Sequence, residues 1–280
     1  ADLSHIPTAG KVTGSLPGEG VFPAGAPEGL QGSLEGCDIV IIPAGVPRKP
    51  GMTRDDLFAI NAGIAKGVVE SCAKYCPNAV LGLIVNPVNS IVPAMAELYK
   101  KRGLDPMKIV GVTTLDCVRS NKFLAQKVGC PVTEVSVPVV GGHAGKSIMP
   151  VFSQAPQSAK LTPAELKAMD ERVQDAGTEV VNAKDGKGSA TLSMAYAGAR
   201  LGRAVLAGLS GQRVVECAYV QSSLSELPYF SSKVEFGPNG VEKVLPLGPM
   251  NAYEEGRLKE ATEQLKGEIA KGLEYAASQN

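Results

Sequence analysis

The sequence predicts an α/β protein in which a parallel sheet is followed by a second domain of the α+β class. Three short apolar runs are separated by helical patterns, and they lie at residues 37–45, 79–85 and 107–111. This alternation of strands and helices predicts a parallel sheet with crossover helices. Uninterrupted apolar runs are typical of strands buried on both faces. From residue 112 onward strands and helices follow in mixed order. We therefore divide the chain into two domains, residues 1–111 and 112–280.

The first domain opens with a glycine- and proline-rich stretch in which KVTGSL, residues 11–16, is predicted to form a strand. Thr53 is followed three residues later by Asp56, which is a signal for a helix N-cap. The helix that starts there is predicted to end near Cys76. Four apolar residues are expected on one side of it, namely Leu57, Ile60, Ile64 and Val68. A second helix is expected between the NPVNS segment and about Arg102.

The second domain is predicted to contain a partly alternating strand, two long helices, two further strands and a closing helix. In this order, the elements are expected at 132–140, 162–184, 189–209, 213–220, 230–236 and 253–276. The chain shows no internal repeat and no low-complexity tract. A repeat architecture is therefore excluded.

Composition limits the classes of partner. The 280 residues are 44% hydrophobic and 20% charged, as in an ordinary globular protein. The 28 basic and 28 acidic residues cancel, so no overall field attracts nucleic acid or an anionic membrane. No apolar run approaches the roughly 20 residues that span a bilayer. We expect neither nucleic acid nor a membrane as a partner.

The six cysteines show no CxxC pair and no zinc-ligand spacing. They are Cys37, Cys72, Cys76, Cys117, Cys130 and Cys217. Free thiols, as in a reducing compartment, are the expected state. We expect no metal site.

Candidate chemistry centres on the second of the chain's two histidines. Asp116 and Arg119 lie one helical turn apart in VTTLDCVRSNKF, and His143 sits on a glycine-flanked turn in PVVGGHAGKSI. A neutral imidazole can accept a proton at physiological pH, while an aspartate holds its other nitrogen. An arginine beside this pair could bind an anionic substrate. The alternative is that His143 is only a hydrogen-bonded turn residue.

The segment GGHAGKS also ends like a phosphate-binding loop, GxxxxGK[ST]. The first glycine of that pattern would have to be residue 140, which is Val140. The pattern also needs a helix directly after the Lys-Ser pair, yet Pro150 lies three residues beyond Ser147. We therefore reject a phosphate-binding loop.

Further candidates lie where strands of the first domain end. Arg48 and Arg54 belong to a basic loop after the first predicted strand, and Asn86 ends the second. Ligands of open parallel sheets bind at the carboxyl ends of strands, and a guanidinium can grip a carboxylate with two hydrogen bonds. Ordinary surface arginines and a turn-forming asparagine are the alternatives. Met194, in the small-residue segment GSATLSMAYAGAR, would by default be a core residue of a closely packed helix.

Taken together, these residues resemble the lactate/malate dehydrogenase family, and specifically malate dehydrogenases of the mitochondrial type. The similarity extends along essentially the whole chain. It is carried by ADLSHI, VIIPAGVPRKPGMTRDDLF, NPVNS, GVTTLDCVRSNKF, VPVVGGHAGKSI, AGTEVVNAK, GSATLSMAYAGAR and VVECAYV. The resemblance implies a Rossmann-type, NAD-binding parallel sheet before residue 112 and an α+β substrate domain after it.

The resemblance also implies roles for single residues. His143 would be the proton acceptor and Asp116 its partner. The residues expected to bind malate or oxaloacetate are Arg48, Arg54, Asn86 and Arg119. Those expected to line the NAD site are Asn61, Ile84, Val85, Asn86 and Met194. A homodimer is also implied, and the small-residue helix around Met194 favours it.

One departure from the family is large, because no GxGxxG fingerprint for the pyrophosphate occurs in this chain. The first β-α-β unit of the family has no counterpart here. In the strand order 3-2-1-4-5-6, residues 11–16 would be strand 3 and residues 37–45 strand 4, with the two central strands absent. A β-α-β unit takes about 30 residues or more, so we expect the natural protein to be longer by at least that much.

The function expected from the resemblance is NAD-dependent oxidation of L-malate to oxaloacetate, a step of the tricarboxylic acid cycle. The expected location is the mitochondrial matrix, with the peroxisome, glyoxysome or cytoplasm as alternatives. Two other functions stay open: a lactate or 2-hydroxy acid dehydrogenase of the same fold, and a non-catalytic interaction scaffold. Arg48 argues against lactate, because a monocarboxylate would leave that cation unpaired in a closed site.

Overall fold

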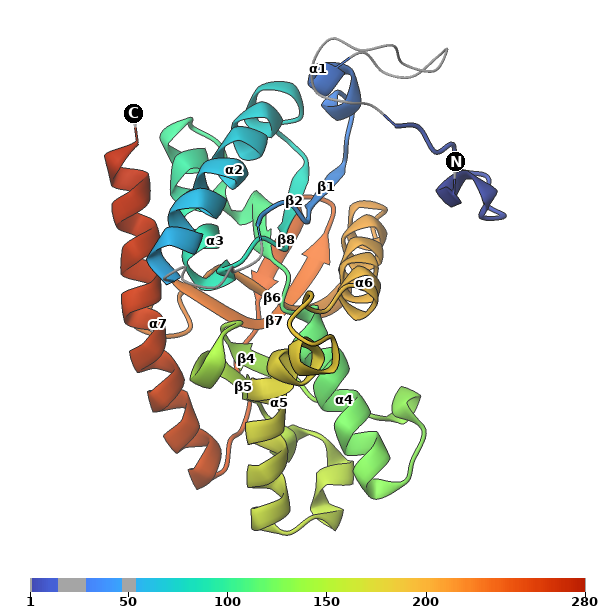
Figure 1. Ribbon diagram of the computed structural model, residues 1–280, viewed down its shortest axis with the longest axis vertical. Coiled ribbons are helices and arrows are strands. Elements are labelled where there is room, and N and C mark those ends of the chain that lie inside the picture. The colour runs from blue at the N-terminus through green and yellow to red at the C-terminus, as the bar shows by residue number, and fades with distance from the viewer. Residues whose placement is uncertain (1, 15–28, 47–53, 280) are drawn as a thin grey trace.

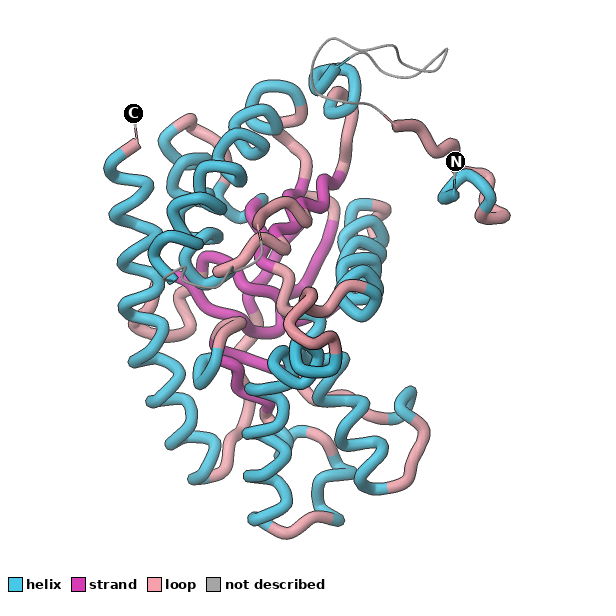
Figure 2. Tube along the Cα trace, in the orientation of Figure 1, coloured by secondary structure: helices cyan, strands magenta, loops and turns pink. Residues whose placement is uncertain are grey.

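The computed structural model describes residues 2–14, 29–46 and 54–279. Its centre is one mixed sheet of eight strands with helices on both faces (Figures 1 and 2). In Figure 1 the helices α2, α3 and α7 cover one side of the sheet, and α6 covers the other. This layered α/β architecture agrees with the predicted fold class.

The parallel part of the sheet is built from β1 (Ile39–Ile42), β2 (Val80–Leu83) and β3 (Ile109–Gly111), which pair in this order. Helices α2 (Arg54–Tyr75) and α3 (Val88–Lys101) connect them. The predicted parallel arrangement is therefore confirmed. Every residue of β2 is buried, as expected for a strand covered on both faces.

The antiparallel part continues the same sheet. Its strands are β4 (Val139–Gly141), β5 (Ile148–Pro150), β6 (Val214–Gln221), β7 (Tyr229–Gly237) and β8 (Gly240–Val244). The order is β1-β2-β3-β6-β7-β4-β5, with β8 paired to β7. The two predicted domains meet where Gly111 of β3 pairs with Tyr219 of β6. A Cβ at Gly111 would lie 3.0 Å from that of Tyr219, so glycine permits this junction.

Four further α-helices carry or support the second half of the chain. They are α4 (Thr114–Val128), α5 (Pro163–Ala183), α6 (Leu192–Leu209) and α7 (Ala252–Ser278). A short α1 (Gly29–Leu34) precedes β1. The 3-10 helices are η1 (Asp2–His5), η2 (Pro106–Lys108), η3 (Val132–Glu134), η4 (Gly145–Ser147), η5 (Phe152–Gln154) and η6 (Pro156–Lys160).

Two strand predictions are wrong. The segment 132–140 forms a 3-10 turn at Val132–Glu134, and only Val139–Gly141 becomes a strand. Pro138 cannot donate a ladder hydrogen bond, which is the physical reason for the short strand. Of the segment 11–16, residues 11–14 form no strand and residues 15–16 lie outside the described part of the chain.

The large apolar residues of α2 do not form its buried side, because Ile60 is 41% exposed and Leu57, Ile64 and Val68 are only half-buried. The apolar residues that α2 buries are Phe58, Ala62, Ala65, Val69 and Cys72. They join the same apolar cluster as the buried side chains of α3. Small alanine side chains let α2 approach its neighbours closely. A search for large apolar residues in the sequence does not detect a buried face made mainly of alanine.

The thiol prediction is confirmed, since all six cysteines are free. Across the described residues, no group of three or more potential metal-ligating side chains comes together. No helix in these same ranges has the length and hydropathy to cross a membrane.

Candidate active site

The side chains of His143 and Asp116 form a hydrogen-bonded pair. Asp116 lies in the first turn of α4 and is fully buried, while His143 follows β4 by two residues. The imidazole Nδ1 is 2.6 Å from Oδ2 of Asp116. The bond predicted between these residues is therefore confirmed, although they are 27 positions apart in sequence.

The surroundings of His143 set its proton affinity. Burial lowers its pKa, but the charge of Asp116 and the hydrogen bond to it raise the pKa, whereas the charge of Arg119 lowers it. The net effect is a pKa above the ordinary value of 6.5. Within residues 54–279 no protein group bonds to Nε2 of His143, so this nitrogen can exchange a proton with a ligand.

Arg119 lies one helical turn beyond Asp116, with its Nη1 3.6 Å from Oδ1 of the aspartate. Its side chain is 13% exposed. Oδ1 of Asp116 is buried and has no hydrogen-bond partner among the described residues. The guanidinium therefore pairs with Asp116 electrostatically and keeps its N–H donors available for an anion.

Glycine and asparagine fix the backbone before His143. Gly141 has a φ of +95°, and a Cβ there would lie 2.2 Å from the carbonyl oxygen of Ser147. A Cβ at Gly142 would lie 2.6 Å from Oδ1 of Asn89. The same Oδ1 accepts a hydrogen bond of 2.8 Å from the backbone N–H of His143.

Sequence reasoning missed Asn89. It singled out Asn86 at the start of NPVNS and passed over the second asparagine of that segment. The available signal was a second amide side chain in the first turn of a helix at a predicted ligand-binding edge. Asn89 is 1% exposed and brings the first turn of α3 against His143.

Asn61 ties together the loops at the carboxyl ends of β1 and β2. Its Nδ2 donates to the carbonyls of Asn86 at 2.7 Å and Val46 at 3.2 Å, and its Oδ1 accepts from the N–H of Val46 at 2.8 Å. The carboxamide of Asn61 is thus fully engaged with backbone groups. These hydrogen bonds hold the two loops in place at this edge of the sheet, where Asn86 is exposed.

Three apolar candidates lie on the same edge. Val85 is buried, and Ile84 and Met194 are half-buried in one apolar cluster. A Cβ at Gly198 of α6 would lie 3.2 Å from Cδ1 of Ile84, so the glycine lets α6 and Met194 approach the strand end. A half-buried apolar pair beside an exposed amide suits one face of a flat ring with a polar edge.

The remaining two candidates cannot be placed in the site. Arg48 lies outside the described residues. Arg54 is the first residue of α2, and its side chain lies outside the described part of the structure. Of the three predicted arginines, the structure therefore brings only Arg119 to the His143–Asp116 pair.

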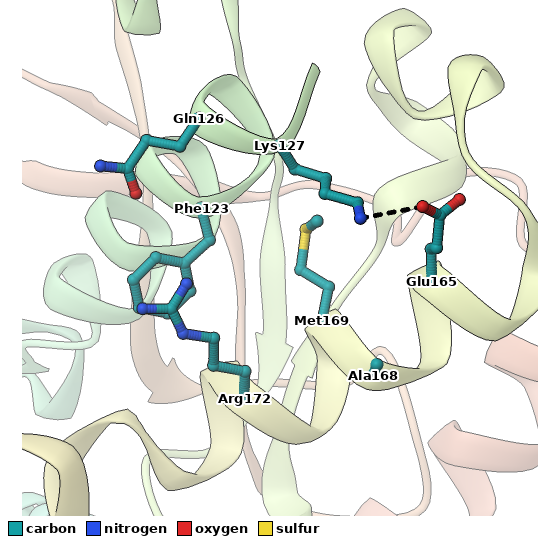
Figure 3. Close-up of a pocket in the computed structure, with 7 residues that line it drawn as sticks. All are labelled: Phe123, Gln126, Lys127, Glu165, Ala168, Met169 and Arg172. Carbon is teal, nitrogen blue, oxygen red and sulfur yellow. Dashed lines mark ion pairs between the residues drawn. The ribbon is translucent and has the colours of Figure 1, made fainter. Parts of the chain in front are cut away.

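A pocket of about 360 Å³ lies elsewhere, between α4 and α5 (Figure 3). None of its lining residues belongs to the His143 cluster. Its two cations already have partners: Lys127 pairs with Glu165 at 2.8 Å, and Arg172 pairs with Glu179 at 2.8 Å. Arg172 also stacks on the ring of Phe123. The candidate active site is therefore the His143 cluster and not this pocket.

Comparison with protein families gives two matches. Residues 18–111 match the lactate/malate dehydrogenase NAD-binding domain, and residues 113–276 match the lactate/malate dehydrogenase α/β C-terminal domain. Together these matches cover most of the chain.

Individual relatives cover nearly the whole chain. A mitochondrial malate dehydrogenase of Eucalyptus gunnii is 57% identical over 279 residues, which are 99% of this chain and 78% of the relative. The mitochondrial malate dehydrogenase of Citrullus lanatus is 56% identical over 278 residues, with the same coverage. A peroxisomal malate dehydrogenase of Arabidopsis thaliana is 53% identical, over 98% of this chain and 76% of the relative.

Solved structures share the fold at lower identity. Apo malate dehydrogenase from Picrophilus torridus superposes with a TM-score of 0.78 at 28% identity, covering 89% of this chain and 78% of that one. Lactate dehydrogenase from Cryptosporidium parvum, in complex with lactic acid and nicotinamide adenine dinucleotide, gives 0.74 at 27% identity, with the same coverage.

Proposed function

The chain belongs to the lactate/malate dehydrogenase family, and from this premise we propose that it catalyses the NAD-dependent interconversion of L-malate and oxaloacetate. Relatives that are 55–57% identical over 99% of the chain are malate dehydrogenases. The observation that carries the chemistry is the 2.6 Å bond between His143 and Asp116.

His143 is the proton acceptor in this proposal. When bound, NAD would supply the acceptor for the hydride that leaves C2 of malate. Nε2 of His143 removes the proton of the C2 hydroxyl, while Nδ1 stays bonded to Asp116. The buried carboxylate keeps the imidazole in the reactive tautomer and stabilises the imidazolium that forms. In the reverse direction the imidazolium returns its proton to the carbonyl oxygen of oxaloacetate.

Arginines and one asparagine hold the substrate. Arg119 lies beside the proton-transfer pair with free donors, which supports a role in binding a carboxylate. For Arg48, Arg54 and Asn86 the support is the match to family segments. Two carboxylates on the substrate call for more than one guanidinium, and this favours a dicarboxylate over lactate.

The described residues fit the nicotinamide end of NAD. Ile84 and Met194 offer the half-buried apolar surface, and Asn86 offers the adjacent amide. Val85 supports this surface from within, and Asn61 would act by holding the loops in place. We assign NAD binding to residues 1–111 and substrate binding and proton transfer to residues 112–280, with Met194 reaching back to the cofactor.

We propose that the enzyme is a homodimer. Helix α6 carries an exposed stripe of Leu192, Tyr196, Ala199 and Leu206, and the first two side chains are 86% and 61% exposed. Exposed large apolar side chains grouped on one helix face mark an interaction surface. Ala195 and Ala199 would let a second copy approach closely.

For the location and the pathway, the names of the relatives are the support. Relatives named mitochondrial support the mitochondrial matrix, and a peroxisomal and a glyoxysomal relative keep those organelles as alternatives. Malate oxidation in the matrix would place the enzyme in the tricarboxylic acid cycle.

Initial rates of NADH oxidation by the full-length protein, with oxaloacetate and then with pyruvate, test the proposed function. We expect kcat/KM to be at least about 10²-fold higher for oxaloacetate, the size of a charge-pair preference. A preference for pyruvate would assign a lactate dehydrogenase. A protein that turns over neither substrate would support the interaction scaffold.

A further inference from the structure

The carboxamide of Asn89 lies between the catalytic loop and α7. Its Oδ1 accepts a hydrogen bond from the backbone N–H of His143 at 2.8 Å. Its Nδ2 donates to Oε2 of Glu268 at 2.7 Å and to Oγ of Ser147 at 3.0 Å. Both polar atoms of this fully buried side chain are therefore engaged, and one of them holds the backbone of the proposed proton acceptor.

Helix α7 holds the same loop at a second point. Nε2 of Gln264 donates to the carbonyl of Ala144 at 2.8 Å and to Oε1 of Glu268 at 3.1 Å. Gly272 brings α7 against α3, since a Cβ there would lie 2.3 Å from the carbonyl oxygen of Ser90. This close packing places Glu268 within reach of Asn89.

The carboxylate of Glu268 determines which way the carboxamide of Asn89 faces. An asparagine side chain can present either its oxygen or its NH₂ group to a neighbour. An ionised carboxylate can only accept hydrogen bonds, so Glu268 binds the NH₂ group. The oxygen is then left for the N–H of His143, where the reversed amide would place two donors face to face.

We propose that Asn89 is a positioning residue for His143 and that Glu268, from α7, sets the orientation of its carboxamide. The inference deepens the proposed function and rests on it. Neither residue touches the reacting atoms. They act by holding the backbone of His143 where its ring meets both Asp116 and the substrate, and a misplacement of about 1 Å can cost about 10²-fold in rate.

Isosteric substitutions test this chain of hydrogen bonds. Asn89→Asp keeps an acceptor for the His143 N–H but places a carboxylate against Glu268, so we expect kcat to fall about 10²-fold. Glu268→Gln alone leaves one mismatched amide and should cost about 5-fold, the value of one hydrogen bond.

The double variant Asn89→Asp/Glu268→Gln restores the donor–acceptor match between the two side chains. The hydroxyl of Ser147, which donates to the carbonyl of Ala144, can turn to the new carboxylate, because that carbonyl keeps its hydrogen bond from Gln264. Nε2 of the new glutamine can donate to the new aspartate, and Oε1 can still accept from Gln264. We expect kcat of the double variant to return to within about 5-fold of wild type, which a double-mutant cycle would report as strong coupling. Glu263→Gln, at an α7 carboxylate that is 80% exposed, is the matched control and should change nothing.

Two readouts separate positioning from simple loss of stability. The first compares kcat with the KM for NADH and the Tm of each full-length variant. The second is the ring-nitrogen NMR spectrum of His143, which is easily assigned because His5 is the only other histidine. We expect Asn89→Asp to lower kcat and weaken the Nδ1 bond to Asp116 in the spectrum, and the double variant to restore both.

The proposal is overturned if the double variant stays as slow as Asn89→Asp, or if the Nδ1 signal of His143 is the same in all variants. It is also overturned if kcat follows Tm alone. A wild-type protein that does not reduce oxaloacetate would refute the proposed function instead. In that case the NMR signals of the same four variants still decide whether Asn89 and Glu268 position His143.

Discussion

Nδ1 of His143 lies 2.6 Å from Oδ2 of Asp116, although Asp116 lies in the first turn of α4 and His143 follows β4. This single contact joins two structural elements and leaves the second ring nitrogen of His143 for chemistry.

Removing the carboxylate of Asp116 should abolish most of the activity. Asp116→Asn keeps the shape but presents an amide to Nδ1, which allows the unreactive tautomer of the imidazole. We expect kcat for malate oxidation to fall about 10³- to 10⁴-fold. Steady-state rates with NAD and malate measure this. Asp175→Asn, at an exposed aspartate of α5, should keep wild-type rates. A loss below tenfold in Asp116→Asn would show that His143 does not depend on this partner.

Replacing Arg119 should change both substrate binding and the titration of His143. Arg119→Gln removes a carboxylate-binding cation, so KM for oxaloacetate should rise about 10²-fold. The charge of Arg119 also lowers the pKa of His143, so that pKa should rise further in the variant. Kinetics at several pH values report both effects, and Arg213→Gln, 75% exposed, serves as the control. An unchanged KM would place Arg119 outside the substrate site.

Arg48 should set the preference for a dicarboxylate. Arg48→Gln removes the cation expected opposite the second carboxylate of the substrate. The ratio of kcat/KM for oxaloacetate to that for pyruvate should fall about 10²- to 10⁴-fold. An unchanged ratio would move this role to Arg54.

The exposed stripe of α6 should form the dimer interface. Tyr196→Asp places a charge in that stripe and should shift the protein from dimer to monomer, because burying an unpaired charge costs several kcal/mol. Light scattering at several concentrations should give twice the chain mass for wild type. Val132→Asp, at a 43% exposed side chain of η3, is the control and should stay dimeric. A monomeric wild type would refute the proposed interface.

Sequence reasoning succeeded where residue type and the pattern of elements contain the signal. The parallel strands were visible as continuous apolar runs, and the His143–Asp116 pair was visible from residue types and their elements. It failed for 132–140, where Pro138 interrupts the ladder inside an apparently suitable strand. For α2 the apolar pattern does not identify the buried face, which alanines and Phe58 form while Ile60 faces solvent.

Asn89 could not have been assigned from local pattern alone. Its role depends on Glu268, which is 179 positions away in sequence. Only the packing of α7 on α3 brings the two together. Such long-range pairs depend on the tertiary structure. The hydrophobic periodicity and the motif spacing of the sequence do not predict them.

In the proposed reaction His143 itself exchanges the substrate proton, and the titration of His143 is the decisive test of this role. The pKa of His143 is raised above 6.5, so the imidazolium persists to higher pH than in a free histidine. Malate oxidation needs the neutral ring; kcat/KM for malate should therefore rise with pH through this pKa, and kcat/KM for oxaloacetate should fall.

The measurement is an NMR titration of His143 in a His5→Gln background, set beside the pH profile of kcat/KM for malate. We expect one shared pKa of His143, above 6.5, in both experiments. A His143 that titrates at or below 6.5, or at a pH clearly different from the kinetic pKa, would contradict it.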